Sequence, residues 1–336
     1  MGDAPDNSDG AAESPRPGIG VGDVLGKILD QLSLSAWPPA IFLVGVTALL
    51  LAIHDRDSFE PGRAVSDLVA STLGVVIVLA VATVLAVVIV QAFEFEVIRA
   101  LEGYWGSGRI ASRYATYRIS RHAGRRRRLV KAASRARRRA FKGACRRLEK
   151  IQLGHLVPVL EADDAGDDLA GFAAGLVTEA LAVGWESAAR PEDIHLWQSL
   201  DQRKSHYPAA SRVLPTRLGN TMRAAEDRMA LADGGDLQGF IMRNYERIPR
   251  ALLNQHSSSR TRLDMYCSLV FASMLLAPVS VGLLAKFGPL VASTSTAILV
   301  LFGVVAYSAG LSSARRLGAV LLAVDAEVSH RLAAQS

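Results

Sequence analysis

The sequence predicts an all-α integral membrane protein with four transmembrane helices, arranged as two hairpins, and a helical cytoplasmic domain inserted between helices 2 and 3. Of the 336 residues, 50% are hydrophobic, and the mean hydropathy of +0.22 is high for a chain of this length. Four apolar runs are long enough to cross a bilayer as helices. A dense cationic stretch lies between the second run and the third.

The N-terminal region divides into a polar tail and an amphipathic segment. Residues 1–20 are rich in Asp, Ser, Gly and Pro, and they bury too little apolar surface to offset the loss of chain entropy, so we expect a disordered tail. They also lack the basic and apolar regions of a cleavable signal peptide. In residues 21–36, apolar side chains recur every three or four positions, which predicts a helix. That helix lies either in the membrane interface or against the cytosolic part of the protein.

The first predicted hairpin covers residues 37–92. Its first span, 37–53, is short for a hydrocarbon core of about 30 Å, and the charged residues after it end it. A polar loop follows. The second span, 68–92, contains no charged residue and is too long for a strand. As a helix it satisfies its own backbone groups in lipid.

The second predicted hairpin covers residues 265–311. Its spans, 265–285 and 289–311, are separated by a turn of three residues, and Pro278 inside the first of them predicts a kink. None of the four spans has an interior charged residue or histidine. Active transporters usually need such groups at depth, so active transport is disfavoured.

The distribution of charge predicts the orientation. Residues 93–150 contain 18 Arg and Lys against 4 acids, a net charge of +14, so the rest of the chain sums to −8. The loop at 54–67 has only Arg56 and Arg63, and the second hairpin turn has only Lys286. Since basic residues collect on the cytoplasmic side, residues 93–264 and both termini, including a C-terminal helix in 312–336, are expected in the cytoplasm.

The inserted domain, 93–264, is expected to be helical. Within 129–151, Ala and Leu recur on one face between arginines, which predicts a helix with a narrow packing seam. Residues 169–185 predict another helix, and 241–263 one that continues into the third span. Between 161 and 168 we expect an acidic loop that is solvated or pairs with the basic residues. A Mg²⁺ site there would need a second acidic cluster, and the sequence has none. The four aspartates of this loop are Asp163, Asp164, Asp167 and Asp168.

The basic run at 99–150 has three interpretations. It is a topology signal on a solvated helix face, a patch for anionic lipid headgroups at about 1 kcal/mol per basic residue, or a nucleic-acid site. The last is disfavoured, because the densest part of the run, 124–140, has no aromatic residues between its arginines and no nucleic-acid-binding fold is recognised. The candidate contacts to anionic lipids or a partner are Arg125, Arg126, Arg127, Arg128, Arg137, Arg138 and Arg139.

A further helix is predicted to begin at Thr216, whose side chain can cap it. Polar residues on this helix either bind an anion or a partner, or pair with one another, as Arg223 can with Glu226 three positions later. Mutual pairing is the favoured interpretation. The candidate site in this region consists of Pro215, Thr216, Arg217, Gly219, Asn220, Arg223 and Glu226.

Three short blocks occur together in this chain: WPPA at residues 37–40, LPTRLGN at 214–220 and RAAED at 223–227. In these blocks, the chain resembles an uncharacterised group of multi-pass membrane proteins from actinobacteria and related bacteria, over most of residues 21–311. It departs from the group at residues 229–243. The resemblance implies a bacterial plasma (inner) membrane and no particular activity.

No nucleophile, metal-ligand or phosphate-loop motif is found in the sequence, and no cofactor is expected. The sequence therefore predicts a membrane-anchored interaction or scaffold module. Its expected partners are the bilayer, with its anionic lipids, and a cytoplasmic protein or further copies of the chain. The alternative is an oligomeric, channel-like protein. Its pore would be lined by Thr47, Thr83, Thr294, Thr296 and Tyr307.

Overall fold

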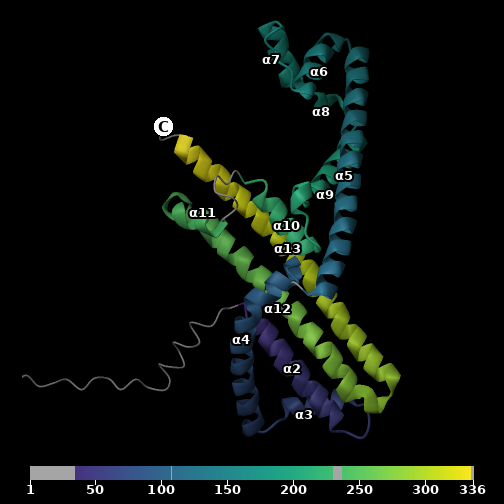
Figure 1. The fold of residues 1–336 in the computed structure, drawn as a ribbon, viewed down its shortest axis with the longest axis vertical. Helices are drawn as coiled ribbons and strands as arrows, with labels where there is room; N and C mark the ends of the chain where they lie inside the picture. The colour runs from purple at the N-terminus through teal and green to yellow at the C-terminus, as the bar shows by residue number, and fades with distance from the viewer. Residues whose placement is uncertain (1–34, 107, 230–236, 334–336) are drawn as a thin grey trace, which may run out of the picture.

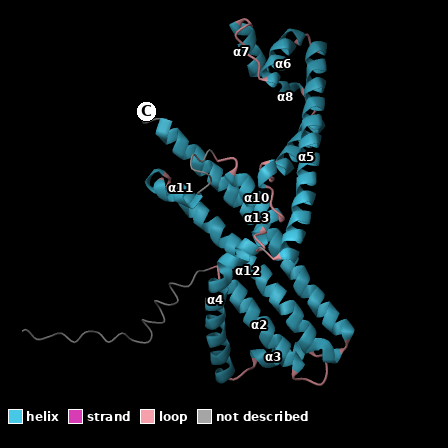
Figure 2. Cartoon of the chain, in the orientation of Figure 1, coloured by secondary structure: helices cyan, strands magenta, loops and turns pink. Residues whose placement is uncertain are grey.

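A computed structural model describes residues 35–106, 108–229 and 237–333 (Figure 1). Every regular element in these ranges is a helix and none is a strand (Figure 2), so the all-α prediction is confirmed. The predicted tail at 1–20 lies outside the described residues, as does the predicted helix at 21–36 apart from its last two positions.

Among the described residues, four helices are long and apolar enough to cross a membrane. They are α2 (Trp37–His54), α4 (Leu73–Glu102), α12 (Arg250–Leu284) and α13 (Pro289–Ala333). Large apolar side chains of α4 stay exposed, among them Val76, Val78 and Ile89. Such a surface is costly in water and stable against lipid, so the chain has the makeup of a multi-pass membrane protein.

The second span of the first hairpin starts later and ends later than predicted. The apolar run beginning at residue 68 is divided, because its first two residues end the short helix α3 (Pro61–Val69). Helix α4 begins at Leu73, after an extended Thr72. It ends where Gly103 adopts the left-handed conformation with φ of +107°, a common end for a helix. Hydropathy reports which residues prefer lipid, so it predicted neither boundary.

Helices α12 and α13 form an antiparallel hairpin (Figure 1), closed by η4 (Ala285–Phe287) and Gly288. Both extend well past their predicted spans. The predicted continuation of a cytosolic helix into the third span is found from Arg250 onward, and the predicted C-terminal helix is the end of α13. Beyond the spans the pair stays packed, since Leu263, Leu317 and Leu321 are buried in one cluster.

A second packing unit surrounds the far end of α5 (Arg109–Lys150). This helix has 42 residues and is about 63 Å long at 1.5 Å per residue. The elements that follow it are η1 (Gly154–Leu156), α6 (Val157–Ala165), α7 (Ala174–Val183), α8 (Trp185–Ala188) and α9 (Pro191–Lys204). We call α2, α4, α12 and α13 the base, α5 to α9 the arm, and α6 to α8 with the far end of α5 the head. The head and helices α2 to α4 lie at opposite ends of the molecule (Figure 1).

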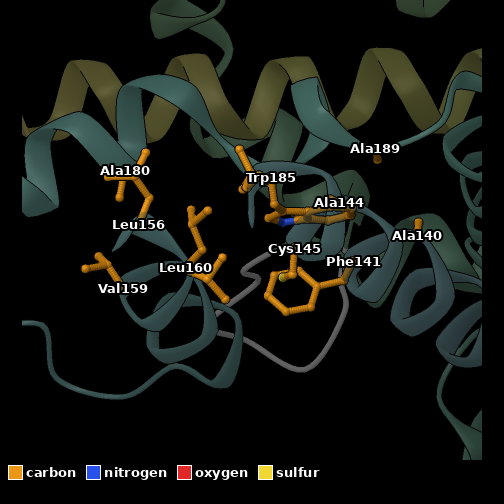
Figure 3. Packing of buried hydrophobic residues seen from close by; sticks show 12 residues of the cluster. Ala140, Phe141, Ala144, Cys145, Leu156, Val159, Leu160, Ala180, Trp185 and Ala189 are labelled. Carbon is orange, nitrogen blue, oxygen red and sulfur yellow. The ribbon is translucent and has the colours of Figure 1, made fainter. Parts of the chain in front are cut away.

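The core of the head explains the predicted Ala and Leu seam. Ala144 and Leu148 of α5 are buried together with Leu160 of α6 and Trp185 of α8. The rings of Phe141 and Trp185 meet edge to face, with 5.5 Å between their centroids, and Figure 3 shows side chains of α5, α6, α7 and α8 gathered here. The arginines between the seam residues stay outside this core because a buried charge without a partner is costly.

Two predictions within the arm were wrong in part. The segment at 161–168, expected as a loop, is helical as far as Ala165, and α6 ends at Gly166 with φ of +77°. The helix expected at 169–185 is formed only in part: α7 occupies Ala174–Val183, and Gly184 separates it from the single turn of α8. The remaining elements connect the arm to the base. They are η2 (Ala210–Arg212), α10 (Arg217–Glu226), α11 (Leu237–Arg243) and η3 (Tyr245–Arg247).

Candidate functional site

Helix α10 is held against the C-terminal end of α4. The hydroxyl of Thr216 accepts a hydrogen bond from the backbone N–H of Gly219 at 3.0 Å, which confirms the predicted cap. The same hydroxyl donates to the carbonyl oxygen of Glu102 at 2.7 Å. That carbonyl belongs to the last turn of α4, where carbonyl groups have no partner within the helix. One side chain therefore starts α10 and satisfies the end of α4.

Two glycines allow α4 and α10 to approach this closely. A Cβ atom on Gly219 would lie 2.1 Å from the carbonyl oxygen of Glu102, and one on Gly103 would lie 2.5 Å from the ring of Pro215. Neither distance is sterically allowed, so a side chain at either position would force the two helix ends apart. Pro215 and Gly219 are thus packing residues.

Asn220 organises the loop before α10 from within. Its side chain is 1% exposed. The side-chain oxygen accepts from the N–H of Leu214 at 2.9 Å, and Nδ2 donates to the carbonyl oxygens of Leu214 at 2.8 Å and Thr216 at 2.5 Å. A buried amide with these partners is satisfied and has a structural role. We call residues 214–226 the junction.

The junction also contacts α5 and α13. The N–H of Leu218 donates to the hydroxyl of Tyr307 at 3.3 Å, and its side chain is buried in the cluster that joins α12 and α13. From α5, Nε of Arg118 donates to the carbonyl oxygen of Pro215 at 3.3 Å, and Nε of Arg126 donates to that of Pro208 at 2.7 Å. The junction therefore connects the arm to every part of the base except α2.

The charged residues at the end of α10 pair with one another, as the favoured interpretation predicted. Arg223 and Glu226 are 3.5 Å apart, and Arg223 donates to the hydroxyl of Tyr104 at 2.7 Å. Arg212 adds a contact to Glu226 at 2.9 Å and an ion pair with Asp227. Arg212 was not among the predicted site residues, because no local spacing connects it to acids that lie across a loop.

Arg217 differs from the rest of the junction because it is exposed, and it lines a cavity together with Asn220 and Thr221. This cavity, of about 120 Å³, lies between α5, α9, α10 and α13, and Arg125, Arg203 and Arg315 also line it. A second cavity of about 440 Å³ adjoins it. The residues common to both are Arg203, His206, Thr221 and Arg315. Of the predicted candidates, Arg125, Arg217 and Asn220 line the smaller cavity.

The basic environment lowers the pKa of two histidines. Burial and then the charges of Arg118, Arg217, Arg125 and Arg121 lower the pKa of His122 from 6.5 to about 4. For His206, burial and then the charges of Arg315 and Arg228 lower the pKa. Both effects oppose the charged form of imidazole, so each histidine stays neutral at pH 7.

The far end of the basic run is partly neutralised by the arm itself. Arg137 pairs with Asp164 at 2.5 Å, and its guanidinium lies 5.7 Å from the ring centroid of Trp185. Arg139 pairs with Asp193 at 3.3 Å. Arg138 is exposed, as are Arg127 and Arg128 closer to the base. The basic run thus contains both paired arginines and solvent-facing ones.

The described residues form no cluster of side chains that could bind a metal ion. No group of three His, Cys, Asp or Glu side chains there is arranged to hold a metal ion. Cys145 and Cys267 are both free and buried, in the head and in the base. Burial and the nearby Glu161 raise the pKa of the Cys145 thiol, so it is a poor nucleophile at pH 7.

Replacing Gly219 with alanine should destabilise the junction by about 1–3 kcal/mol, because the new methyl group overlaps the carbonyl of Glu102. Thermal unfolding in detergent measures the effect. Gly143→Ala on α5 is the matched control: a Cβ there meets nothing within 4 Å, so stability should rise by up to about 1 kcal/mol. A Gly219→Ala protein that melts at or above the wild-type temperature would contradict this packing.

His122 should make the fold less stable in acid. The pKa of His122 is near 4 in the folded protein and 6.5 in the unfolded chain. The contribution of neutral His122 to the stability of the fold is therefore complete above pH 6.5, and it is lost as the pH falls toward 4. On acidification the unfolded chain is protonated before the folded protein. This difference lowers the free energy of unfolding by about 2 kcal/mol at pH 5. His122→Asn keeps a polar group for the hydroxyl of Tyr207, its partner at 3.2 Å, and does not titrate.

Melting temperatures at pH 7.5 and pH 5 compare the two proteins, and the variant should lose less stability on acidification. His195→Asn, at an exposed position of α9, controls for the loss of an imidazole. Equal acid sensitivity in the wild type and the His122→Asn variant would show that His122 is not the group responsible.

Comparisons with known proteins add no family to these observations. No protein-family model matches the chain, and no curated protein or solved structure matches it. The functional argument therefore rests on the geometry of the base, the junction and the arm.

Proposed function

We propose that this chain is a multi-pass protein of a bacterial plasma membrane whose cytoplasmic arm serves as an interaction module. The observation that carries the proposal is the separate core of the head, which α5 holds far from the apolar helices (Figure 1). A helix of 42 residues with its own cluster of packed helices at the tip has the form of a spacer that presents a surface to a partner.

Contacts between the hairpin tips support a topology of two hairpins. Lys286, in the turn between α12 and α13, donates to the carbonyl oxygen of Arg56 at 2.7 Å. Nδ1 of His54 lies 2.7 Å from the carbonyl oxygen of Leu283. The two tips therefore lie at the same end of the base. This end has few basic residues, which supports an outward-facing position for it and a cytoplasmic position for the arm.

The position of the basic run supports a division of its roles. Arg125 lines a cavity with Leu311, where the fourth predicted span ends, so the first part of the run lies near headgroup level. Arg138 lies 13 residues further along α5, which is about 20 Å at 1.5 Å per residue. We therefore assign contact with anionic lipids to the group Arg125 to Arg128, and contact with a cytoplasmic partner to the exposed surface of the head.

No observation favours the channel-like alternative. The hydroxyls of Thr47, Thr83 and Thr296 each donate to a carbonyl of their own helix at 2.7 to 2.8 Å. The hydroxyl of Tyr307 accepts from the N–H of Leu218. These four groups are used inside one chain, where a pore would need them to face a shared path, while Thr294, the fifth predicted lining residue, is exposed.

Photo-crosslinking in native membranes tests the interaction module. A photoactivatable amino acid at Leu181 or Leu196, both exposed on the arm, should give a discrete adduct with a second protein. The same probe at Val78, on the exposed face of α4, should give lipid adducts instead. A membrane-impermeant thiol reagent tests on which side of the membrane the arm lies. A cysteine in place of Ser187 should react only after the membrane is permeabilised.

Two results would contradict the proposal. One is labelling of residue 187 in intact cells, which would place the arm outside. The other is an adduct between copies of the chain at Val78 with no adduct at either arm position, which would indicate an assembly through the spans.

A further inference from the structure

The two adjoining cavities lie at the point where the fourth predicted span ends. Leu311 and Arg315 of α13 line the smaller one, facing α5, α9 and α10. Its volume of about 120 Å³ is several times the roughly 10–15 Å³ that a single water molecule needs. The larger cavity, about 440 Å³, continues it along α13. Together the two cavities offer space for an ion with substituents. They are open to solvent beside the exposed arginines.

The charge around these cavities is of one sign. Five arginines line them, and no Asp or Glu is among the described lining residues. They come from four elements and the turn after α10. These residues are Arg125, Arg203, Arg217, Arg228 and Arg315.

The neighbouring carboxylates are engaged elsewhere. Asp201 pairs with Lys204, and Asp227 and Glu226 pair with Arg212. Across residues 35–106, 108–229 and 237–333, no carboxylate lies within ion-pair distance of the five cavity arginines. Within these ranges no carboxylate offsets their mutual repulsion, which solvent or a bound anion would reduce.

The chemistry of guanidinium narrows the class of ligand. Each guanidinium presents a planar fork of donors that matches the oxygens of phosphate, and its charge does not titrate away. Five arginines from several elements line two adjoining cavities, which fits an anion with more than one charge and with oxygens on several sides. Burial and then the charges of Arg315 and Arg228 lower the pKa of His206, and the second of these effects is in keeping with this field.

We propose that these cavities form one binding site for a phosphate-bearing anion, held by Arg125, Arg203, Arg217 and Arg315 with Arg228 at its edge. Two sources supply this chemistry at such a place. One is the headgroup of an anionic phospholipid in the adjacent leaflet, and the other is a soluble phosphate or diphosphate. A bound anion would connect α5 and α9 of the arm to α10 and α13, and so add to the contacts of the junction.

The test uses the full chain, delipidated in an uncharged detergent, and two double variants of equal charge. Arg125→Gln with Arg315→Gln removes one cavity arginine from α5 and one from α13. Arg135→Gln with Arg316→Gln removes exposed arginines from the same two helices outside these cavities. All four positions are exposed, so both variants should fold, which circular dichroism and size-exclusion chromatography check.

One arm of the experiment measures retention of phosphatidic acid and phosphatidylglycerol, against phosphatidylcholine, by native mass spectrometry. The other titrates inorganic phosphate and diphosphate by calorimetry in phosphatidylcholine nanodiscs. Loss of two charge-assisted contacts should weaken binding about tenfold or more in the cavity variant, while the control variant should bind like the wild type. Binding in the first arm alone identifies the lipid headgroup, and binding in the second identifies a soluble phosphate.

Absence of binding in both arms would overturn the proposal. An equal loss in the two double variants would also overturn it, because the affinity would then come from the diffuse charge of the basic run and not from the cavity.

Discussion

The carbonyl oxygen of Glu102 lies at the contact on which the arrangement of the molecule depends. It accepts the hydroxyl of Thr216 at 2.7 Å, and Gly219 lies so close that any side chain there would collide with it. This contact fixes the orientation of α10 relative to α4. Because α10 in turn contacts α5 and α13, the same geometry determines where the arm begins relative to the apolar base. A small polar contact thus positions two much larger units.

The base and the arm are stabilised by different means. In the base, the α12 and α13 hairpin continues past the predicted spans and buries leucines in a cluster with Leu218. In the arm, one face of α5 closes a small core with Trp185 and Leu160, while its arginines stay in solvent or pair with acids of the neighbouring helices. The junction connects them mainly through backbone carbonyl groups and buried polar side chains, which require a defined geometry where apolar packing tolerates some sliding.

Features that depend on local sequence were predicted well. The apolar runs, the Ala and Leu seam of α5, the cap at Thr216 and the pairing of Arg223 with Glu226 all follow from spacing along one element. Features that depend on tertiary proximity were missed. Arg203, Arg228 and Arg315 lie on separate segments of the sequence, and the meeting of α9, α10 and α13 brings them to one cavity. Asp164 pairs with Arg137 across the head, which was one of the two predicted alternatives for the acidic segment, but its position inside α6 was not predicted.

The central claim is that the junction holds the arm in a fixed relation to the base. Spin labels at Lys142→Cys on α5 and Ser329→Cys on α13, both exposed, measure that relation by pulsed electron resonance in a chain lacking Cys145 and Cys267. We expect one narrow distance distribution with the junction intact, and a broad one after Asn220→Ala removes the three hydrogen bonds of its side chain. A distribution that is already broad with the junction intact, or one that Asn220→Ala leaves unchanged, would contradict the claim.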